Sequence, residues 1–253
     1  ADIKICDIAI GSGAFPGGIL HEIVIARETL TAYIGESPER TRYDFKRHAI
    51  QESIYGVDID ASAVDIAKLR LWLSLVVDEE NFETIKPLPN LDYKIVCGNS
   101  LLGVKRDLLN NHLFKELEAL KQQFFDETNP RKKKEEKEKI DRLIKQITNN
   151  DEHFDFEIYF SEVFHQQCGF DITIGNPPYV RHEAIKEQKL QLSKQFGSFY
   201  CGTADLYTYF YKKGLENRNF ANLFASFCKG KINKSNEQSS IFCEKWTEKV
   251  KRV

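Results

Sequence analysis

The sequence contains no methionine among its 253 residues, and no apolar run approaches the roughly 18–20 residues that span a bilayer. Its first ten residues lack the charged and apolar regions of a signal peptide. The cysteines are scattered without a C-x-x-C pair, and the histidines form no complete set of metal ligands. We therefore expect a reduced, cytoplasmic protein with neither a membrane span nor a metal site. The missing initiator methionine predicts that the chain starts inside a longer one.

An excess of charge of one sign is also missing. Lys and Arg together number 36, Asp and Glu 38, and the net charge is −2. Proteins that bind nucleic acid usually carry a basic surface. The basic block at 131–134 is followed at once by Glu135 and Glu136, which predicts a solvated helix face. Either this protein does not bind nucleic acid, or its basic surface is local or lies in a part that this sequence lacks.

Short apolar runs alternate with helical patterns along the chain. Four runs are typical of buried strands, at residues 2–10, 53–60, 93–97 and 170–174. Apolar residues recur at helical spacing after the first two, at 17–34 and from a cap at Asp60 or Ser62. This alternation predicts a doubly wound α/β sheet of the Rossmann-like kind, which binds ligands at the carboxyl ends of its strands.

The remaining segments predict the domain organisation. Two helical patterns within 105–150, separated by Asn129 and Pro130, predict an antiparallel helical hairpin inserted into the sheet domain. Residues 180–200 are polar and loop-like, and 204–216 resume a helical pattern. From about 217 no strand or helix period is clear. We therefore expect a catalytic core at 1–216 and a C-terminal tail of uncertain structure at 217–253.

The first two predicted strands end in residues suited to a nucleotide-like ligand. Gly11 and Gly13 lack a Cβ, so a ligand can approach the backbone just before a helix N-terminus. Asp58 ends the second strand, where a carboxylate can accept hydrogen bonds from ribose hydroxyls. The alternative is a tight turn without a ligand and a solvated Asp58. Together the two features favour an adenosine-containing cofactor, either a dinucleotide or S-adenosylmethionine.

The stretch GNPPY, residues 175–179, follows the fourth strand and favours S-adenosylmethionine. The Asn176 amide oxygen and the Pro177 carbonyl are two acceptors that a rigid proline turn holds at fixed separation. They suit both hydrogens of a planar NH₂ group, and Tyr179 offers a face for stacking. An amine held in this way can attack a sulfonium methyl group without a general base. The alternative is an ordinary proline-rich loop.

The motifs DIAIGSGAF, GVDID, GNSLL and NPPY occur in that order, and the chain resembles the gamma-type N6-adenine DNA methyltransferases across residues 2–216. The closest branch has modification and cleavage in one polypeptide (type IIG or IIS restriction–modification enzymes). The resemblance implies methyl transfer from S-adenosylmethionine to a flipped adenine in double-stranded DNA, without a metal. NPPY is the most specific motif, and the ordered set is stronger than any single member.

The resemblance also implies roles for individual residues. The predicted cofactor-binding residues are Asp7, Gly11 and Gly13 at the methionine moiety, Asp58 at the ribose, and Asn99 and Phe210 at the adenine. The predicted catalytic residues are Asn176, Pro177 and Tyr179, and the predicted substrate-binding residues are Asn176, Pro178 and Tyr179.

The sequence departs from the family pattern in several places. Ile8 stands where a proline is usual, and Asn99 where an aspartate is more usual. The upstream helix, the closing β-hairpin after residue 216 and a target-recognition domain are not recognisable. Two alternatives follow: an inactive remnant that retains the fold, or a methyltransferase of a glutamine amide in a protein, which also uses NPPY. The helical hairpin and the segment TADLYTYF favour DNA over a glutamine amide.

Overall fold

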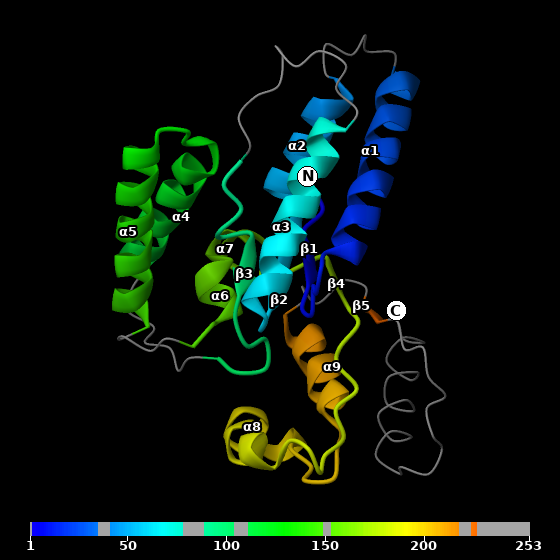
Figure 1. The fold of residues 1–253 in the computed structure, drawn as a ribbon, viewed down its shortest axis with the longest axis vertical. Helices are drawn as coiled ribbons and strands as arrows, with labels where there is room; N and C mark the ends of the chain where they lie inside the picture. Colours follow the sequence, from blue (N-terminus) through cyan, green and yellow to red (C-terminus); the bar gives the residue numbers. More distant parts are fainter. Residues whose placement is uncertain are drawn as a thin grey trace.

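The structure, a computed structural model, describes residues 2–34, 41–77, 89–103, 111–148, 153–217 and 224–226. This part of the chain contains a parallel five-stranded sheet in the order β3-β2-β1-β4-β5 (Figure 1). The strands are β1 (Ile5–Asp7), β2 (Ile54–Asp58), β3 (Ile95–Cys97), β4 (Ile172–Gly175) and β5 (Phe224–Ser226). The strand order reverses between β1 and β4, where ligands bind in such folds. The predicted doubly wound α/β class is confirmed.

Three helices cover one face of the sheet. The helix that follows the second strand carries Val64, Ala67, Leu71 and Leu75 on one side, at the predicted helical spacing, and all four are buried. Asp60 caps this helix, since its carboxylate accepts from the Ser62 N–H at 2.9 Å. These helices are α1 (Ala14–Ile34), α2 (Arg42–Glu52) and α3 (Ala61–Val76).

An aromatic cluster fills the opposite face. Tyr55 of β2 lies edge-on against Phe160 and Phe170, with ring centroids 5.2 and 5.3 Å apart. Along β2, Ile54 faces the helices α1–α3 and Tyr55 the aromatic side, so both faces of this strand are buried, as a parallel sheet requires. The short helices on this face are α6 (Phe156–Tyr159) and α7 (Ser161–Gln167).

The predicted pair of helices lies between β3 and β4 in the sequence. Helices α4 (Asn111–Asp126) and α5 (Pro130–Ile147) pack side by side (Figure 1). Asn129 caps α5 by accepting from the N–H groups of Arg131 and Lys132, at 3.0 and 3.3 Å, and Pro130 starts the helix. The basic block at 131–134 lies at the surface on this first turn, as the sequence predicts. Residues 105–110, 149 and 150 of the predicted insertion lie outside the described residues.

Largely buried ion pairs join this helix pair to the sheet. Glu162 of α7 lies 2.9 Å from Lys121 Nζ of α4 and 3.5 Å from Lys94 Nζ, just before β3. Burial would raise the pKa of Glu162, but the two lysines lower it to about 2. Burial lowers the pKa of Lys94 to about 8. The three charges fix α4 and α7 against the start of β3.

The prediction of a loop at 180–200 is wrong. Residues 186–199 form α8 (Lys189–Phe196) between two short 3₁₀ helices, Lys186–Gln188 and Gly197–Phe199. Leu192 and Phe196 are buried in a cluster with Leu206 and Tyr209 of α9 (Leu206–Glu216). Two apolar residues are enough to bury one side of α8, although the segment is polar, because α9 supplies the other half of this small core.

The sequence shows no recognisable strand after residue 216, but the structure contains one there. Strand β5 pairs in parallel with β4, in the register Thr173 with Phe224 and Gly175 with Ser226. Three residues are too few for the alternation that predicts a strand from sequence. The division into a core at 1–216 and a tail at 217–253 stays a prediction, but the sheet crosses that boundary. Residues 218–223 and 227–253 lie outside the described residues.

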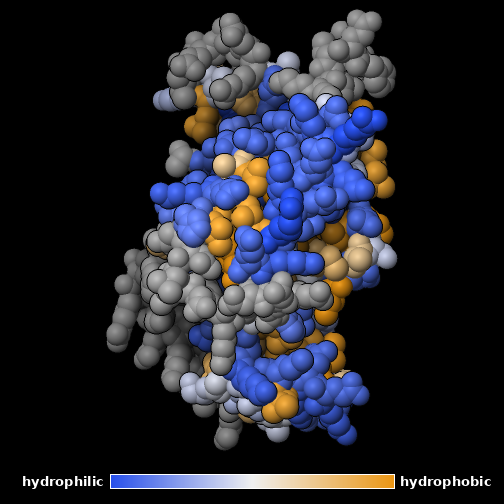
Figure 2. All heavy atoms as spheres, turned by 90° about the vertical axis from the view of Figure 1, so that its left-hand side faces the viewer, coloured by the Kyte–Doolittle hydropathy of each residue, from blue (hydrophilic) through white to orange (hydrophobic). Residues whose placement is uncertain are grey.

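The surface is mixed in character. In Figure 2, hydrophilic side chains cover most of the visible face, around a band of hydrophobic atoms. Elsewhere an apolar groove of about 750 Å³ runs between α1 and the sheet, lined by Ile19 and Ile23 of α1 and Ile172 and Ile174 of β4. None of the helices described here is long and apolar enough to cross a membrane.

Candidate functional site

The loop after β1 contains two glycines that are needed for different reasons. Both adopt positive φ, +50° at Gly11 and +78° at Gly13. A Cβ on Gly13 would lie 3.0 Å from the Cβ of Ala67, so this glycine lets α3 pack closely against the loop. A Cβ on Gly11 would meet nothing within 4 Å. The backbone at Gly11 therefore faces open space beside the N-terminal end of α1, where a ligand can approach.

Asp58 fastens this loop to the end of β2. Its Oδ2 accepts from the Gly11 N–H at 2.8 Å, and its Oδ1 accepts from the Asp60 N–H at 3.0 Å. A carboxylate has about four lone-pair positions, so further acceptor capacity remains. Asp58 thus lies where a ribose-binding acid is expected, and it also orders the glycine loop, which its sequence position does not indicate.

Asp7, the last residue of β1, is buried and only partly satisfied. Its Oδ1 accepts from the Ala9 N–H at 3.1 Å, while Oδ2 has no hydrogen-bond partner among the described residues. Burial raises the pKa of Asp7 to about 7, the bond from Ala9 opposes the rise, and the charge of Asp58 adds to it. An unpaired buried carboxyl oxygen is costly. Asp7 is therefore suited to a ligand that brings a hydrogen-bond donor or a positive charge.

The loop after β3 closes against the loop after β1. Ser100 is buried and donates its hydroxyl to the Ile8 carbonyl at 2.7 Å. Asn99, just before it, is half-buried and uses its side-chain oxygen to accept from the Leu101 N–H at 3.0 Å. The amide nitrogen of Asn99 and the second lone pair of its side-chain oxygen remain for a ligand. Sequence reasoning missed Ser100, although it stands in the same GNS stretch as Asn99.

The GNPPY turn leaves the sheet directly beside Asp7. A Cβ on Gly175 would lie 3.7 Å from Asp7 Oδ1 and 3.3 Å from Ile8 Cγ1, so the glycine allows β4 to end close to the first loop. Beyond it, Asn176 is exposed, and the Tyr179 side chain is 53% exposed. An exposed amide and an exposed ring at the switch point are available to a second ligand from solvent.

The remaining residues of the predicted set differ in their exposure to solvent. Pro177 is buried and Pro178 is exposed. Phe210 of α9 is half-buried and packs against both the aromatic cluster of the sheet and the cluster around α8. The sheet thus brings Asp7, Gly11, Asp58 and Asn176 to one edge through β1, β2 and β4. The roles of all these residues stay predictions.

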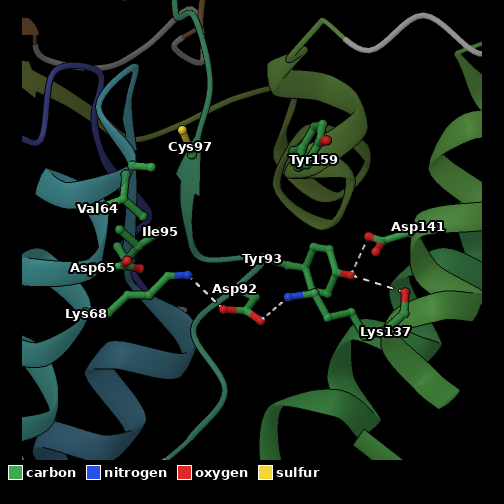
Figure 3. Close-up of a pocket in the computed structure, with 11 residues that line it drawn as sticks. Val64, Asp65, Lys68, Asp92, Tyr93, Ile95, Cys97, Lys137, Asp141 and Tyr159 are labelled. Carbon is green, nitrogen blue, oxygen red and sulfur yellow. Dashed lines mark hydrogen bonds and ion pairs between the residues drawn. The ribbon is translucent and has the colours of Figure 1, made fainter. Parts of the chain in front are cut away.

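A cavity of about 240 Å³ lies elsewhere, lined by residues of α3, β3 and α5 (Figure 3). Asp92 lies between two lysines there, 2.7 Å from Lys68 Nζ and 2.8 Å from Lys137 Nζ. Burial would raise the pKa of Asp92, but Lys137 and Lys68 lower it to about 2. Tyr93 donates its hydroxyl to Asp141 at 2.8 Å. These groups satisfy one another, and none belongs to the glycine loop or the proline turn, so this cavity is not the candidate site.

Metal-binding residues are not gathered in the described part of the chain. It holds no group of three or more His, Cys, Asp and Glu side chains that could bind a metal ion.

Comparisons with known proteins agree with this architecture. Residues 52–245 match the profile of the Eco57I restriction-modification methylase family. A type II restriction enzyme and methyltransferase of Escherichia coli, RM.Eco57I, is 27% identical over 199 residues, 73% of this chain and 15% of that protein. A putative type II restriction enzyme and methyltransferase of Methanocaldococcus jannaschii is 42% identical over 105 residues, 40% of this chain and 9% of that protein. The chain thus matches a small part of each relative.

Proposed function

Because the chain belongs to the Eco57I restriction-modification methylase family, we propose that it transfers a methyl group from S-adenosylmethionine to N6 of an adenine in DNA. The observation that carries this proposal is the proximity of two features at the switch point. The proline turn with Asn176 leaves β4 beside the buried carboxyl of Asp7, and Asp58 holds the glycine loop at the same edge. A methyl donor on the loop and an amine on the turn would meet there.

The residues of the first three strand ends fit the chemical groups of S-adenosylmethionine. The unpaired Oδ2 of Asp7 suits a positively charged donor, and the open space over Gly11 suits close approach to the backbone. The remaining acceptor capacity of Asp58 suits ribose hydroxyls. We assign recognition of the adenine of S-adenosylmethionine to Asn99 and Phe210. The cofactor, when bound, supplies an electrophilic methyl group on sulfur.

The turn supplies the contacts for the methyl acceptor. The side-chain oxygen of Asn176 and the carbonyl of Pro177 would accept the two hydrogens of the adenine amine, which would leave the nitrogen lone pair free for the methyl group that the cofactor would supply. As the N–C bond forms, the S–CH₃ bond of the cofactor would break and leave a neutral thioether, and the methylated amine would release one proton to solvent. Tyr179, being exposed, stacks on the face of a base that has left the duplex. Holding the two reactants in line supplies much of the acceleration.

Labelled methyl transfer tests the proposal. The chain is incubated with S-adenosylmethionine labelled on its methyl group and with DNA free of N6-methyladenine, in parallel with a protein that exposes a glutamine amide. We expect label in the DNA alone. Label in the protein alone would favour the glutamine-amide alternative. Label in neither, with cofactor binding intact, would favour an inactive remnant.

A matched pair of asparagines separates the two halves of the site. Asn176→Ala removes an acceptor for the target amine, so we expect cofactor affinity close to that of the unaltered chain. Asn99→Ala is the control variant, and we expect weaker cofactor binding, measured by calorimetry. If the two variants showed the opposite pattern, the assignment of cofactor and substrate sides would be wrong.

A further inference from the structure

The turn that carries Tyr179 is braced by the start of α9. The Leu206 N–H donates to the Val180 carbonyl at 3.0 Å. The His182 N–H donates to Asp205 Oδ1, also at 3.0 Å. Asp205 occupies the N-cap position of α9, yet its carboxylate makes no capping bond within that helix. The Asp205 carboxylate instead accepts from His182, so the first turn of α9 is bonded to the residues that follow the proline turn.

Tyr207, the second residue of α9, contacts the Tyr179 ring. The two ring centroids are 5.8 Å apart with an angle of 49° between their planes. On its other side Tyr207 meets Tyr211 edge-on, at 5.7 Å and 81°. Tyr207 is itself half-buried. A side chain placed between two rings in this way has little freedom to reorient.

The angles decide between two uses of this row of rings. Aromatic platforms that stack successive bases offer each base an open ring face. Here the planes turn by 49° and then by 81°, so the three rings do not form a continuous surface. Tilted and edge-on contacts favour fixed relative orientations of the rings. The row is therefore built to orient the first ring rather than to carry several bases.

We propose that Tyr207 is a positioning residue, which holds the Tyr179 ring in the orientation that stacks on the target base. This inference rests on the proposed function and adds a residue to which the sequence motif assigns no role. The ring contact, rather than the hydroxyl, does the positioning. Loss of one such aromatic contact corresponds to a roughly two- to tenfold change in an equilibrium or rate constant.

A double-mutant cycle on the DNA methylation activity of the intact chain tests the inference. The variants are Tyr207→Ala, Tyr207→Phe, Tyr179→Ala and the double variant Tyr179→Ala with Tyr207→Ala. Tyr33→Ala, at a tyrosine of α1 that is 90% exposed, is the control. The readouts are kcat/KM for DNA and the dissociation constant of S-adenosylmethionine.

We expect Tyr207→Ala to lower kcat/KM for DNA about two- to tenfold, with cofactor affinity unchanged. Tyr207→Phe and Tyr33→Ala should match the unaltered chain. In the Tyr179→Ala background, Tyr207→Ala should cause no further loss, because its effect passes through the Tyr179 ring. If Tyr207→Ala unfolds the chain, Tyr207→Leu replaces it, with the same expected result.

Three results would overturn the inference while leaving the proposed function standing. They are full activity of Tyr207→Ala, equal loss in Tyr207→Phe, or the same fractional loss with and without Tyr179. An unaltered chain that methylates no DNA would overturn the proposed function, and this inference with it.

Discussion

Asp7→Asn should stabilise the protein at neutral pH, although it removes a predicted cofactor contact. Asp7 is 1% exposed, and burial raises its pKa to about 7 from a usual value of 3.8. The unfolded chain therefore ionises this carboxyl near pH 4, whereas the folded chain keeps the proton until about pH 7. The unfolded state loses its proton first, so the free energy of unfolding falls as the pH rises between these values.

The size of the effect follows from the pKa difference of about three units. At about 1.4 kcal/mol per unit, ionisation of Asp7 would lower the free energy of unfolding by up to about 4 kcal/mol above pH 7 and would not change it below pH 4. Asn at this position has nearly the same shape and cannot ionise. The variant should therefore match the unaltered chain near pH 4 and exceed its unfolding free energy at pH 8.

Urea unfolding of both proteins at several pH values measures this difference. Other titrating groups contribute equally to both proteins, so the difference between the two curves isolates Asp7. A difference that stayed constant from pH 5 to pH 8 would show that Asp7 is ionised throughout, and the argument from its burial would fail. A cationic ligand should favour the ionised form, so its binding should release a proton below pH 7.

Three further variants test other parts of the account. Asn176→Ala should reduce methyl transfer to background while cofactor affinity, measured by calorimetry, stays within about threefold; a large loss of cofactor affinity would contradict its role. Gly13→Ala should destabilise the fold by about 1–3 kcal/mol, because it combines a φ of +78° with a 3.0 Å contact, and Gly11→Ala by only about 1 kcal/mol; equal losses in thermal unfolding would argue against the close packing of α3. Glu162→Gln should cost up to about 4 kcal/mol in urea unfolding, since it removes the carboxylate that lies between the largely buried Lys121 and Lys94; a loss below about 1 kcal/mol would mean that water reaches these charges.

Features set by local chemistry could be predicted from the sequence. The stripe at Val64, Ala67, Leu71 and Leu75, the glycine turn and the helix cap at Asp60 each follow from a few neighbouring residues, and all occur in the structure. Placing the candidate residues at one edge also followed, because parallel strands share their carboxyl ends.

Features set by tertiary packing could not be predicted in this way. Helix α8 depends on Leu206 and Tyr209, which lie beyond it in the sequence. The bond from Gly11 to Asp58 joins residues 47 positions apart, and no local pattern indicates it. Helical spacing places Leu30 on the apolar side of the helix predicted at 17–34, but this residue is 59% exposed. Periodicity identifies an apolar stripe without showing what covers it.

The most direct test of the central claim is the identity of the methylated product. DNA that has been incubated with the chain and S-adenosylmethionine is digested to nucleosides, which are analysed by mass spectrometry. The account predicts N6-methyldeoxyadenosine with the unaltered chain and none with Asn176→Ala. Methyldeoxycytidine as the product, or N6-methyldeoxyadenosine formed equally well by Asn176→Ala, would contradict it.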